Sequence, residues 1–307
     1  MQTGASTSST TDGGGIAAWA TDRDAIDQAL RVVTDRHGKR LGRVGEAIRY
    51  ALSSSGKRVR GLLCVAAYRA AGGRGEIDQI AAAIEIVHAY SLVHDDLPCM
   101  DNDLIRRGRP TVHVAFGVVR ATVAGVAMVP LAAHAMIDAC ANSGVDTRSA
   151  EGIVRRLMRA SGAGGMVGGQ LLDLLGERTA LSIEELESVH RGKTGALIAA
   201  AAAIGGMAAM ASRQRVDALD RFGAALGLAF QVMDDVLDLT STTATLGKTA
   251  GRDTELRKST YPGLIGLAAA RALAHQKVEE GRAALRAEEL LTPDLDRFAG
   301  FVVERAS

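Results

Sequence analysis

Charged residues of both signs crowd into one short segment, HDDLPCMDNDLIRRGRP, which runs from His94 to Pro110. Four aspartates come first and three arginines follow. A second acidic segment, FQVMDDVLD, carries Asp234, Asp235 and Asp238. Carboxylates this close together repel one another, so each segment needs a counter-charge. The two segments are therefore the first candidates for a functional site.

The second acidic segment has the spacing of one helix face. Gln231, Asp234, Asp235 and Asp238 fall at i, i+3, i+4 and i+7. Oxygen ligands without histidine or cysteine favour Mg2+, or Mn2+, over zinc. The simpler alternative is a solvated helix face or a charged helix end, although carboxylates near a helix C-terminus oppose its dipole.

The first acidic segment combines carboxylates with a break in the helix. Asp95 and Asp96 are adjacent, and Asp101 follows a turn that contains Pro98. Because the residue before a proline avoids the helical conformation, the chain can leave the helix there and fold Asp101 back. Mg2+ commonly binds a few carboxylates together with the phosphates of a substrate. The segment therefore suggests a metal site that is completed by a phosphorylated ligand.

The arginines that follow suit the same kind of ligand. Arg106 and Arg107 offer planar guanidinium groups, which bind phosphate through paired hydrogen bonds. Together with metal-bound carboxylates they suggest a diphosphate held between Mg2+ and guanidinium groups. The alternative is that the arginines only form salt bridges with Asp101 or Asp103.

The composition limits the possible partners of this 307-residue chain. A net charge of +1 gives no overall field that would attract nucleic acid or an anionic membrane. Cys64, Cys99 and Cys140 are odd in number and lack metal-ligand spacing, so they are predicted to be free thiols in a reducing, cytoplasmic compartment. Aromatic residues make up only 3%, so small residues must allow helices to approach closely.

Helical periodicity dominates the chain. Apolar residues recur at spacings of three and four over 29–38, 77–96, 218–239 and 264–287, and convincing strand patterns are absent. We therefore predict an all-α, single-domain helical bundle over 17–307, preceded by a flexible tail over 1–16. The apolar run TGALIAAAAAIGGMAAM is predicted to be a buried helix and not a membrane span.

Two local patterns refine this prediction. Ser182 and Glu185 have the spacing of a capping box, which marks the start of a helix. Each acidic segment follows an apolar helical stretch, and the two segments echo each other in sequence. We therefore expect the two acidic sites to face each other.

Seven blocks of the chain resemble the trans-prenyltransferases that make short-chain isoprenyl diphosphates, in the order found in that family. The match runs from about Gly56 to Pro262. The blocks are SGKRVRG, HAYSLVHDDLPCMDNDLIRRGRPTVH, MVGGQLLDL, HRGKTGAL, FQVMDDVLD, LGKTAGRD and KSTYP. The resemblance implies a helical bundle around a deep central cavity, normally a homodimer, with both aspartate motifs at the mouth of the cavity.

The resemblance also implies roles for individual residues. It implies that Asp95 and Asp101 ligate two Mg2+ ions and Asp234 a third, with Asp96, Asp235 and Asp238 in support. The residues implied for the allylic diphosphate are Arg106, Lys193, Thr194, Gln231, Lys248 and Lys258. Those implied for isopentenyl diphosphate are Lys57, Arg60, His88 and Arg107. The implied reaction is ionisation of the allylic substrate, followed by attack of the isopentenyl double bond on the carbocation.

Spacing alone supports part of this assignment. His88 and Asp95 are seven residues apart and so share a helix face, which would place the second-substrate pocket beside the metal site. Taken without the motif, a lone helical histidine is more often structural, and Lys193 has the alternative of a surface lysine.

Product length in this family depends on side chains below the first aspartate motif. Tyr90 and Ser91 stand five and four residues before Asp95. An ideal helix turns Tyr90 about 140° away from Asp95, so its place on the cavity wall rests on the resemblance. A tyrosine here, with the inserted Pro98 and Cys99, resembles bacterial farnesyl diphosphate synthases. We therefore predict the fifteen-carbon product, with geranyl or geranylgeranyl diphosphate as alternatives.

The chain departs from the family pattern at two positions. Val126 stands where the family usually has an aspartate, and that carboxylate is expected to support the arginines. Gly61 stands where many members have proline, a change we regard as minor.

Two other activities remain to be separated from the predicted one. A class I terpene cyclase also uses a metal-binding aspartate motif, but it carries an Asn/Ser/Glu motif in place of the second aspartate cluster. A low-activity regulatory subunit of a prenyl synthase would be expected to lose one aspartate motif, whereas both are intact here.

Overall fold

The structure is a computed structural model that describes residues 19–38, 42–177, 179–240 and 258–304. The predicted tail over 1–16 and the LGKTAGRD motif with Lys248 therefore lie outside the described residues. The bounds of the elements are α2 Ala20–Gly38, α3 Gly42–Leu52, α4 Val59–Ala70, α5 Asp78–Asp95, β1 Ile105–Arg106, β2 Arg109–Pro110, α6 Val112–Phe116, α7 Val118–Asn142, α8 Thr147–Ser161, α9 Met166–Gly176, α10 Ile183–His190, η1 Arg191–Gly195, α11 Ala196–Ala208, α12 Arg213–Thr240, α15 Tyr261–Ile265, α16 Leu267–Arg286 and α17 Pro293–Glu304.

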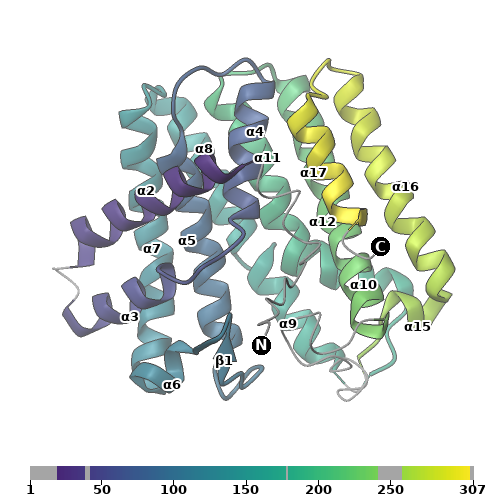
Figure 1. Cartoon of the computed structure of the whole chain (residues 1–307), viewed down its shortest axis with the longest axis horizontal. Coiled ribbons are helices and arrows are strands. Elements are labelled where there is room, and N and C mark those ends of the chain that lie inside the picture. The colour runs from purple at the N-terminus through teal and green to yellow at the C-terminus, as the bar shows by residue number, and fades with distance from the viewer. Residues whose placement is uncertain (1–18, 39–41, 178, 241–257, 305–307) are drawn as a thin grey trace, which may run out of the picture.

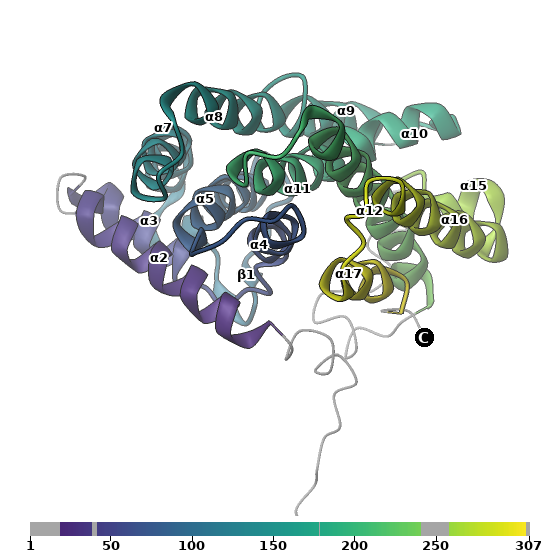
Figure 2. The same ribbon diagram turned by 90° about the horizontal axis from the view of Figure 1, so that it is seen from above.

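The long helices stand side by side as a bundle, and the hairpin and α9 lie toward its lower end in the view of Figure 1. Helix α11 packs against α4, α8 and α12, while α5 packs against α7 and α12 packs against α16. Seen from above, α4, α5, α11 and α12 are surrounded by the other helices (Figure 2). The all-α prediction is confirmed, whereas the domain boundaries stay a prediction.

The ends of the helices follow the local sequence signals. Helix α5 ends at Asp95, before Pro98, as predicted. Ser182 and Glu185 form both hydrogen bonds of a capping box at the start of α10, which confirms that prediction. The helix predicted to start at Leu264 instead starts at Leu267, because Gly266 adopts a φ of 84° and separates α15 from α16.

A two-residue hairpin was not predicted from the sequence. Strands β1 and β2 pair antiparallel, with Arg106 opposite Arg109, and they are the only strands in the described part of the chain. Arg107 and Gly108 have φ values of 53° and 73°, the sign that a type I′ turn requires at both central positions. The hairpin is too short to show the alternation by which strands are recognised in a sequence.

Glycines let three helical segments touch around η1, a π-helical turn between α10 and α11. A methyl group on Gly169 of α9 would lie 2.0 Å from the backbone nitrogen of Lys193, and one on Gly192 would lie 2.8 Å from the Gly169 Cα. On the opposite side, a methyl group on Gly227 of α12 would lie 2.7 Å from the Gly195 Cα. The π turn is therefore clamped between α9 and α12, as the small-residue composition led us to expect.

The apolar run TGALIAAAAAIGGMAAM is largely buried, as predicted, and forms the end of η1 and all of α11. Among the described helices, α7 alone is long and apolar enough to cross a membrane, with 50% of its most apolar window buried inside the protein. Its other side is exposed at Val119, Val123, Val126 and Ile137. All three cysteines are free thiols, which confirms that prediction, and Cys64 and Cys140 are buried.

The glycine clamp gives the first testable prediction. Gly169→Ala should destabilise the protein by about 1–3 kcal/mol, because the added methyl group would collide with backbone that cannot move aside. Denaturant unfolding measures this change. Gly164→Ala is the matched control, since nothing lies within 4 Å of its methyl position. Equal stability of the two variants would contradict the clamp.

Candidate active site

The first acidic segment folds back on itself at the end of α5. The Asp101 N–H donates a 2.8 Å hydrogen bond to the Asp95 carbonyl oxygen, and the Asn102 N–H donates to the Leu97 carbonyl. The predicted return of Asp101 toward Asp95 is therefore confirmed. Burial, and to a smaller extent the nearby Asp101 charge, raises the pKa of Asp95 to about 6, although the positive charge of Lys193 opposes this shift. These carboxylates share a site that favours an added cation.

Arg106 is tied to the same helix end by Asp96. Its Nε donates to both Asp96 oxygens, at 2.8 and 3.0 Å, and its Nη2 lies 2.6 Å from Asp96 Oδ1. A weaker contact of 3.4 Å reaches Asp103. The salt-bridge alternative is thus present, with Asp96 as the main partner. Because these bonds use Nε and Nη2, Asp96 fixes the plane of the guanidinium at the mouth of the site.

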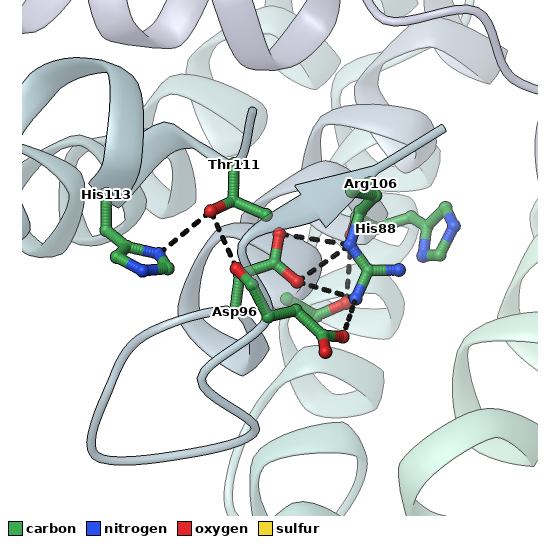
Figure 3. A network of polar contacts seen from close by, with 7 residues as sticks. His88, Asp96, Arg106, Thr111 and His113 are labelled. Atoms are coloured by element: carbon green, nitrogen blue, oxygen red, sulfur yellow. Dashed lines mark hydrogen bonds and ion pairs between the residues drawn. The ribbon is translucent and has the colours of Figure 1, made fainter. Parts of the chain in front are cut away.

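The hairpin behind Arg106 is held by Thr111. The Thr111 hydroxyl donates to the Asp103 carbonyl at 2.7 Å and lies 3.0 Å from His113 Nδ1. Since the hydroxyl proton is directed to Asp103, His113 Nδ1 has to be the donor to Thr111. Figure 3 shows Thr111 and His113 on one side of the Arg106–Asp96 pair and His88 on the other.

The second acidic segment is connected to η1 by a chain of hydrogen bonds. The Thr194 hydroxyl donates to Gln231 Oε1 at 2.7 Å, and Gln231 Nε2 donates to Asp234 Oδ2 at 3.2 Å. Asp235 has a different partner, because it accepts a 3.0 Å hydrogen bond from the Tyr261 N–H. Asp238 is buried. Of the three aspartates, Asp234 is therefore the one joined to the site through Thr194.

Two lysines meet at a carboxylate that sequence analysis did not select. Lys193 Nζ lies 2.6 Å and Lys258 Nζ 3.1 Å from the same Asp173 oxygen, and Lys258 also lies 3.3 Å from Glu177. Burial alone would raise the pKa of Asp173, but the two ammonium groups lower it. Lys193 is thus a paired, largely buried side chain and not a surface lysine. Lys258 also feels the charge of Asp101.

A second group of cations surrounds His88. Burial, and then Arg60, Arg107, Arg106 and Arg58 in that order, lowers the pKa of His88 well below its ordinary value. His88 is therefore neutral at neutral pH and sits among four guanidinium groups. Burial also lowers the pKa of Arg60, although the Glu85 and Asp234 carboxylates oppose the shift. Such a concentration of positive charge suits a multiply charged anion.

Lys57 directly precedes Arg58 at the start of α4. It is exposed, and its Nζ is 5.7 Å from the ring centroid of Phe301 on α17. Arg107 Nη1 donates to the Ser54 hydroxyl at 3.3 Å, and a methyl group on Gly56 would lie 2.5 Å from that nitrogen. Gly56 therefore leaves room for the Arg107 side chain.

Arg58 and Glu85 hold the chain in place at the start of α4, a role that was not predicted from the sequence. Buried Arg58 has a φ of 48°, lies 2.7 Å from Asp27 and donates to the Leu52 and Ser54 carbonyls. Buried Glu85 accepts a 2.8 Å hydrogen bond from the Gly61 N–H. A proline at position 61 would lack that N–H, so the departure at Gly61 gives the first turn of α4 an additional contact.

Tyr90 and Asp95 face one cavity of about 250 Å³. The side chains lining it are Tyr90, Ser91, His94, Asp95, Met100, Met166, Val167, Gln170, Leu171, Leu174 and Lys193. The 140° separation on an ideal helix does not keep Tyr90 out, because the cavity wraps around this side of α5. The Tyr90 ring also packs edge-on against His94, with 5.3 Å between centroids.

Val126, which stands where the resemblance leads us to expect an aspartate, is 60% exposed, and Arg106 takes its support from Asp96 and Asp103. The role expected of a carboxylate at this position stays a prediction. The preceding Gly125 is the residue in close contact, since a methyl group there would lie 2.1 Å from His94 Nε2.

The donors present fit Mg2+ that arrives with a phosphorylated ligand. Within the described ranges, no group of three or more His, Cys, Asp or Glu side chains converges on one point. Asp95 and Asp101 nevertheless form a crowded, partly buried carboxylate pair, and Asp234 is held beside Thr194. Mg2+ suits such a set because it needs only one or two carboxylates besides phosphate and water.

Comparisons with known proteins agree with this geometry. The polyprenyl synthetase family model matches residues 42–289. Farnesyl diphosphate synthase of Escherichia coli is 43% identical over 85% of this chain and 89% of its own length. Geranylgeranyl pyrophosphate synthetase of Pyrococcus horikoshii superposes with a TM-score of 0.83 at 29% identity, covering 94% of this chain and 98% of its own. A Helicobacter pylori geranyltransferase, solved with magnesium and isoprenyl diphosphate, gives 0.77 at 27% identity and 98% coverage of both chains.

The raised pKa of Asp95 gives a prediction for the metal-free protein. Because the pKa of Asp95 rises from an ordinary value of 3.8 to about 6 in the folded chain, stability falls as the pH rises between these two values and stays reduced above them. Asp95→Asn should therefore stabilise the protein by up to about 3 kcal/mol at about pH 8 and by little at about pH 3.5. Thermal unfolding in chelator measures both values.

A control and a contrary result complete this test. Asp24→Asn changes an exposed carboxylate and should have little effect at either pH. The same stabilisation by Asp95→Asn at both pH values would show that ionisation of Asp95 is not its source.

Proposed function

The chain belongs to the polyprenyl synthetase family of prenyltransferases, and we propose that it condenses isopentenyl diphosphate with dimethylallyl and geranyl diphosphates to give mainly farnesyl diphosphate. The observation that carries this proposal is that both aspartate motifs approach the same turn, η1. The Lys193 charge pulls the pKa of Asp95 downward, and the next residue, Thr194, is hydrogen-bonded through Gln231 to Asp234. Two carboxylate groups and a set of cations thus surround one site, which suits a diphosphate and its metal ions.

The two groups of cations correspond to two diphosphates in this proposal. The allylic diphosphate would contact Arg106, Lys193 and Lys258 beside Asp95, with Thr194 and Gln231 completing the set. Lys248, outside the described residues, is assigned to the same ligand from its motif. Isopentenyl diphosphate would lie among Lys57, Arg60, His88 and Arg107. Neutral His88 suits this place because it can donate a hydrogen bond without adding a further charge to the arginine cluster.

Asp95 and Asp101 would hold two Mg2+ ions and Asp234 a third, while Asp96, Asp235 and Asp238 orient neighbouring groups. Mn2+ has similar ligand preferences. When bound with the substrate, these ions would draw negative charge onto the leaving diphosphate. Asp96 supports this arrangement by holding Arg106, and Asp235 supports it by anchoring the start of α15. The helix that carries Asp234 is thereby fixed to the segment that follows Lys258.

The chain's own residues divide the reaction into binding, ionisation and protection. Lys193 and Lys258 would exchange Asp173 for the allylic diphosphate and stabilise the charge that develops on it. The isopentenyl double bond then forms the new carbon–carbon bond at the allylic cation, and a proton passes to the released diphosphate. Apolar side chains such as Met166, Leu171 and Leu174 line the cavity and exclude water from the cation.

Tyr90 is proposed to limit the product to fifteen carbons, and Ser91 lines the same wall. Tyr90 is buried and braced by His94, so it forms a rigid part of that wall. Geranylgeranyl or geranyl diphosphate would be the main product if the hydrocarbon chain passes Tyr90 or stops short of it.

The exposed side of α7 is proposed as a homodimer interface. Val119, Val123, Val126 and Ile137 follow one face of the helix and are 80%, 46%, 60% and 51% exposed. Exposed apolar side chains that gather along one helix face mark a contact surface. The proposal also accounts for the apolar character of α7 without a membrane. The free thiols support the proposal of a cytoplasmic location.

Product analysis tests the proposed reaction and the role of Tyr90 together. Purified protein incubated with isopentenyl and dimethylallyl diphosphates and Mg2+ should form mainly the fifteen-carbon diphosphate. Tyr90→Ala removes the aromatic wall and should shift the main product to twenty carbons or more. Chain lengths are measured by chromatography after removal of the diphosphate. An unchanged distribution in the variant would remove Tyr90 from the proposal.

The same assay separates an enzyme from a regulatory subunit. Asp95→Ala and Asp234→Ala should each abolish product formation by the isolated chain. A wild-type chain that releases no diphosphate would support the regulatory alternative instead.

The homodimer proposal predicts that a charged side chain on the exposed face of α7 converts dimers into monomers. Val123→Arg would bury an unpaired charge in the interface and should raise the dimer dissociation constant by at least about 100-fold. Sedimentation velocity measures the dimer and monomer fractions. Val32→Arg on α2, which is 41% exposed in the wild type, is the control and should leave the dimer intact. A Val123→Arg variant that sediments like the wild type would place the interface elsewhere.

A further inference from the structure

Gln170 on α9 is buried without satisfied hydrogen bonds. Its residue exposure is 9%, and neither its Nε2 nor its Oε1 has a hydrogen-bond partner among the described residues. Buried amide groups nearly always have partners, because leaving them unpaired costs free energy. A glutamine kept in this state therefore points to a ligand that supplies the missing partner.

The cavity around Gln170 indicates what that ligand is. Gln170 lines the cavity shared by Asp95 and Lys193, so one side of the amide is close to the ionic groups. Met166 and Leu174, one turn before and one turn after it on α9, line the same cavity with apolar side chains. Gln170 thus stands where a charged head and a hydrocarbon tail would join.

The positions of Asp173, Gln170 and Met166 on α9 also show how the ionic and apolar groups follow one another along the helix axis. Asp173 binds Lys193 and Lys258, which places its turn at the mouth of the site. Gln170 lies about 4.5 Å further along the axis, and Met166 about 6 Å beyond that. A diphosphate near the lysines would therefore bring the first atoms of its hydrocarbon chain level with Gln170.

The position of Gln170 is fixed by the residue before it. Gly169 belongs to the clamp in which a methyl group would lie 2.0 Å from the Lys193 nitrogen. The backbone that carries Gln170 is therefore held against the backbone that carries Lys193. The amide itself is covered in the ligand-free chain, and the flexible Met100, Met166 and Lys193 side chains around it can move when a ligand enters.

We propose that the Gln170 side-chain amide donates a hydrogen bond to the oxygen that joins the diphosphate to C1 of the allylic substrate. This inference rests on the proposed prenyltransfer reaction and adds a catalytic residue to it. As the C1–O bond breaks, its electron pair stays on that oxygen, which becomes an anion, while C1 becomes part of the allylic cation. A donor already aimed at the oxygen stabilises the charge as it develops. The amide oxygen then faces the cation and gains a partner in turn.

The test variant is Gln170→Met, which keeps the volume and removes both polar atoms. The free protein should unfold about 2–4 °C higher, because a buried unpaired amide has been removed. Turnover should nevertheless fall about 100-fold, as expected for the loss of one such donor. The KM for isopentenyl diphosphate should stay within about threefold, since that substrate binds elsewhere. A residue with a merely structural role would not give higher stability together with lower kcat.

Two further variants sharpen the test. Gln170→Glu keeps acceptor oxygens but lacks the N–H donor at neutral pH, so its turnover should fall at least as far. Gln276→Met is the control, because Gln276 is exposed and bonded to Glu280 on α16, and neither kcat nor unfolding temperature should rise or fall appreciably.

The outcomes separate this inference from the proposed function. A wild-type chain that forms no prenyl diphosphate would overturn the proposed function itself. With an active wild type, the donor role is overturned if Gln170→Met or Gln170→Glu keeps half or more of the wild-type kcat. It is also overturned if Gln170→Met loses activity together with unfolding temperature, because that combination indicates a packing role.

Discussion

The close approach of three backbones around η1 is the constraint on which the site depends. Gly169 and Gly192 meet on one side of the π turn, and Gly195 and Gly227 meet on the other. Side chains larger than hydrogen would push α9 and α12 away from the turn. Because these positions are glycines, Lys193 can reach Asp173 on α9, and Thr194 can form a hydrogen bond with Gln231 on α12. The rigid frame therefore extends to both charged parts of the site.

Much of the site could be predicted from the sequence because its residues follow short, regular spacings. The i, i+3, i+4 and i+7 pattern placed Gln231 and Asp234 on one helix face, where they are hydrogen-bonded to each other. Pro98 predicted the end of α5 and the return of Asp101. Ser182 and Glu185 likewise predicted the start of α10, since a capping box depends on local backbone preferences.

The missed residues act through contacts between segments far apart in the chain. Asp173 pairs with Lys193 and Lys258, and Arg58 pairs with Asp27, so no local pattern reveals either role. The motifs pointed to a missing carboxylate at Val126, but a single sequence cannot tell an inward position on α7 from an outward one there. Helix geometry was misleading for Tyr90. It placed Tyr90 on another side of α5 than Asp95, whereas one cavity is lined by both residues.

The shared oxygen of Asp173 has a consequence for how the site empties. Two lysines already rest on this internal anion, so in the proposed reaction an incoming diphosphate would replace one anion by another and gain only the difference in binding free energy. When the diphosphate leaves, the lysines would return to Asp173, and no unpaired couple of buried cations would be left behind. The carboxylate would thus lower the affinity for the leaving group and make repeated turnover easier.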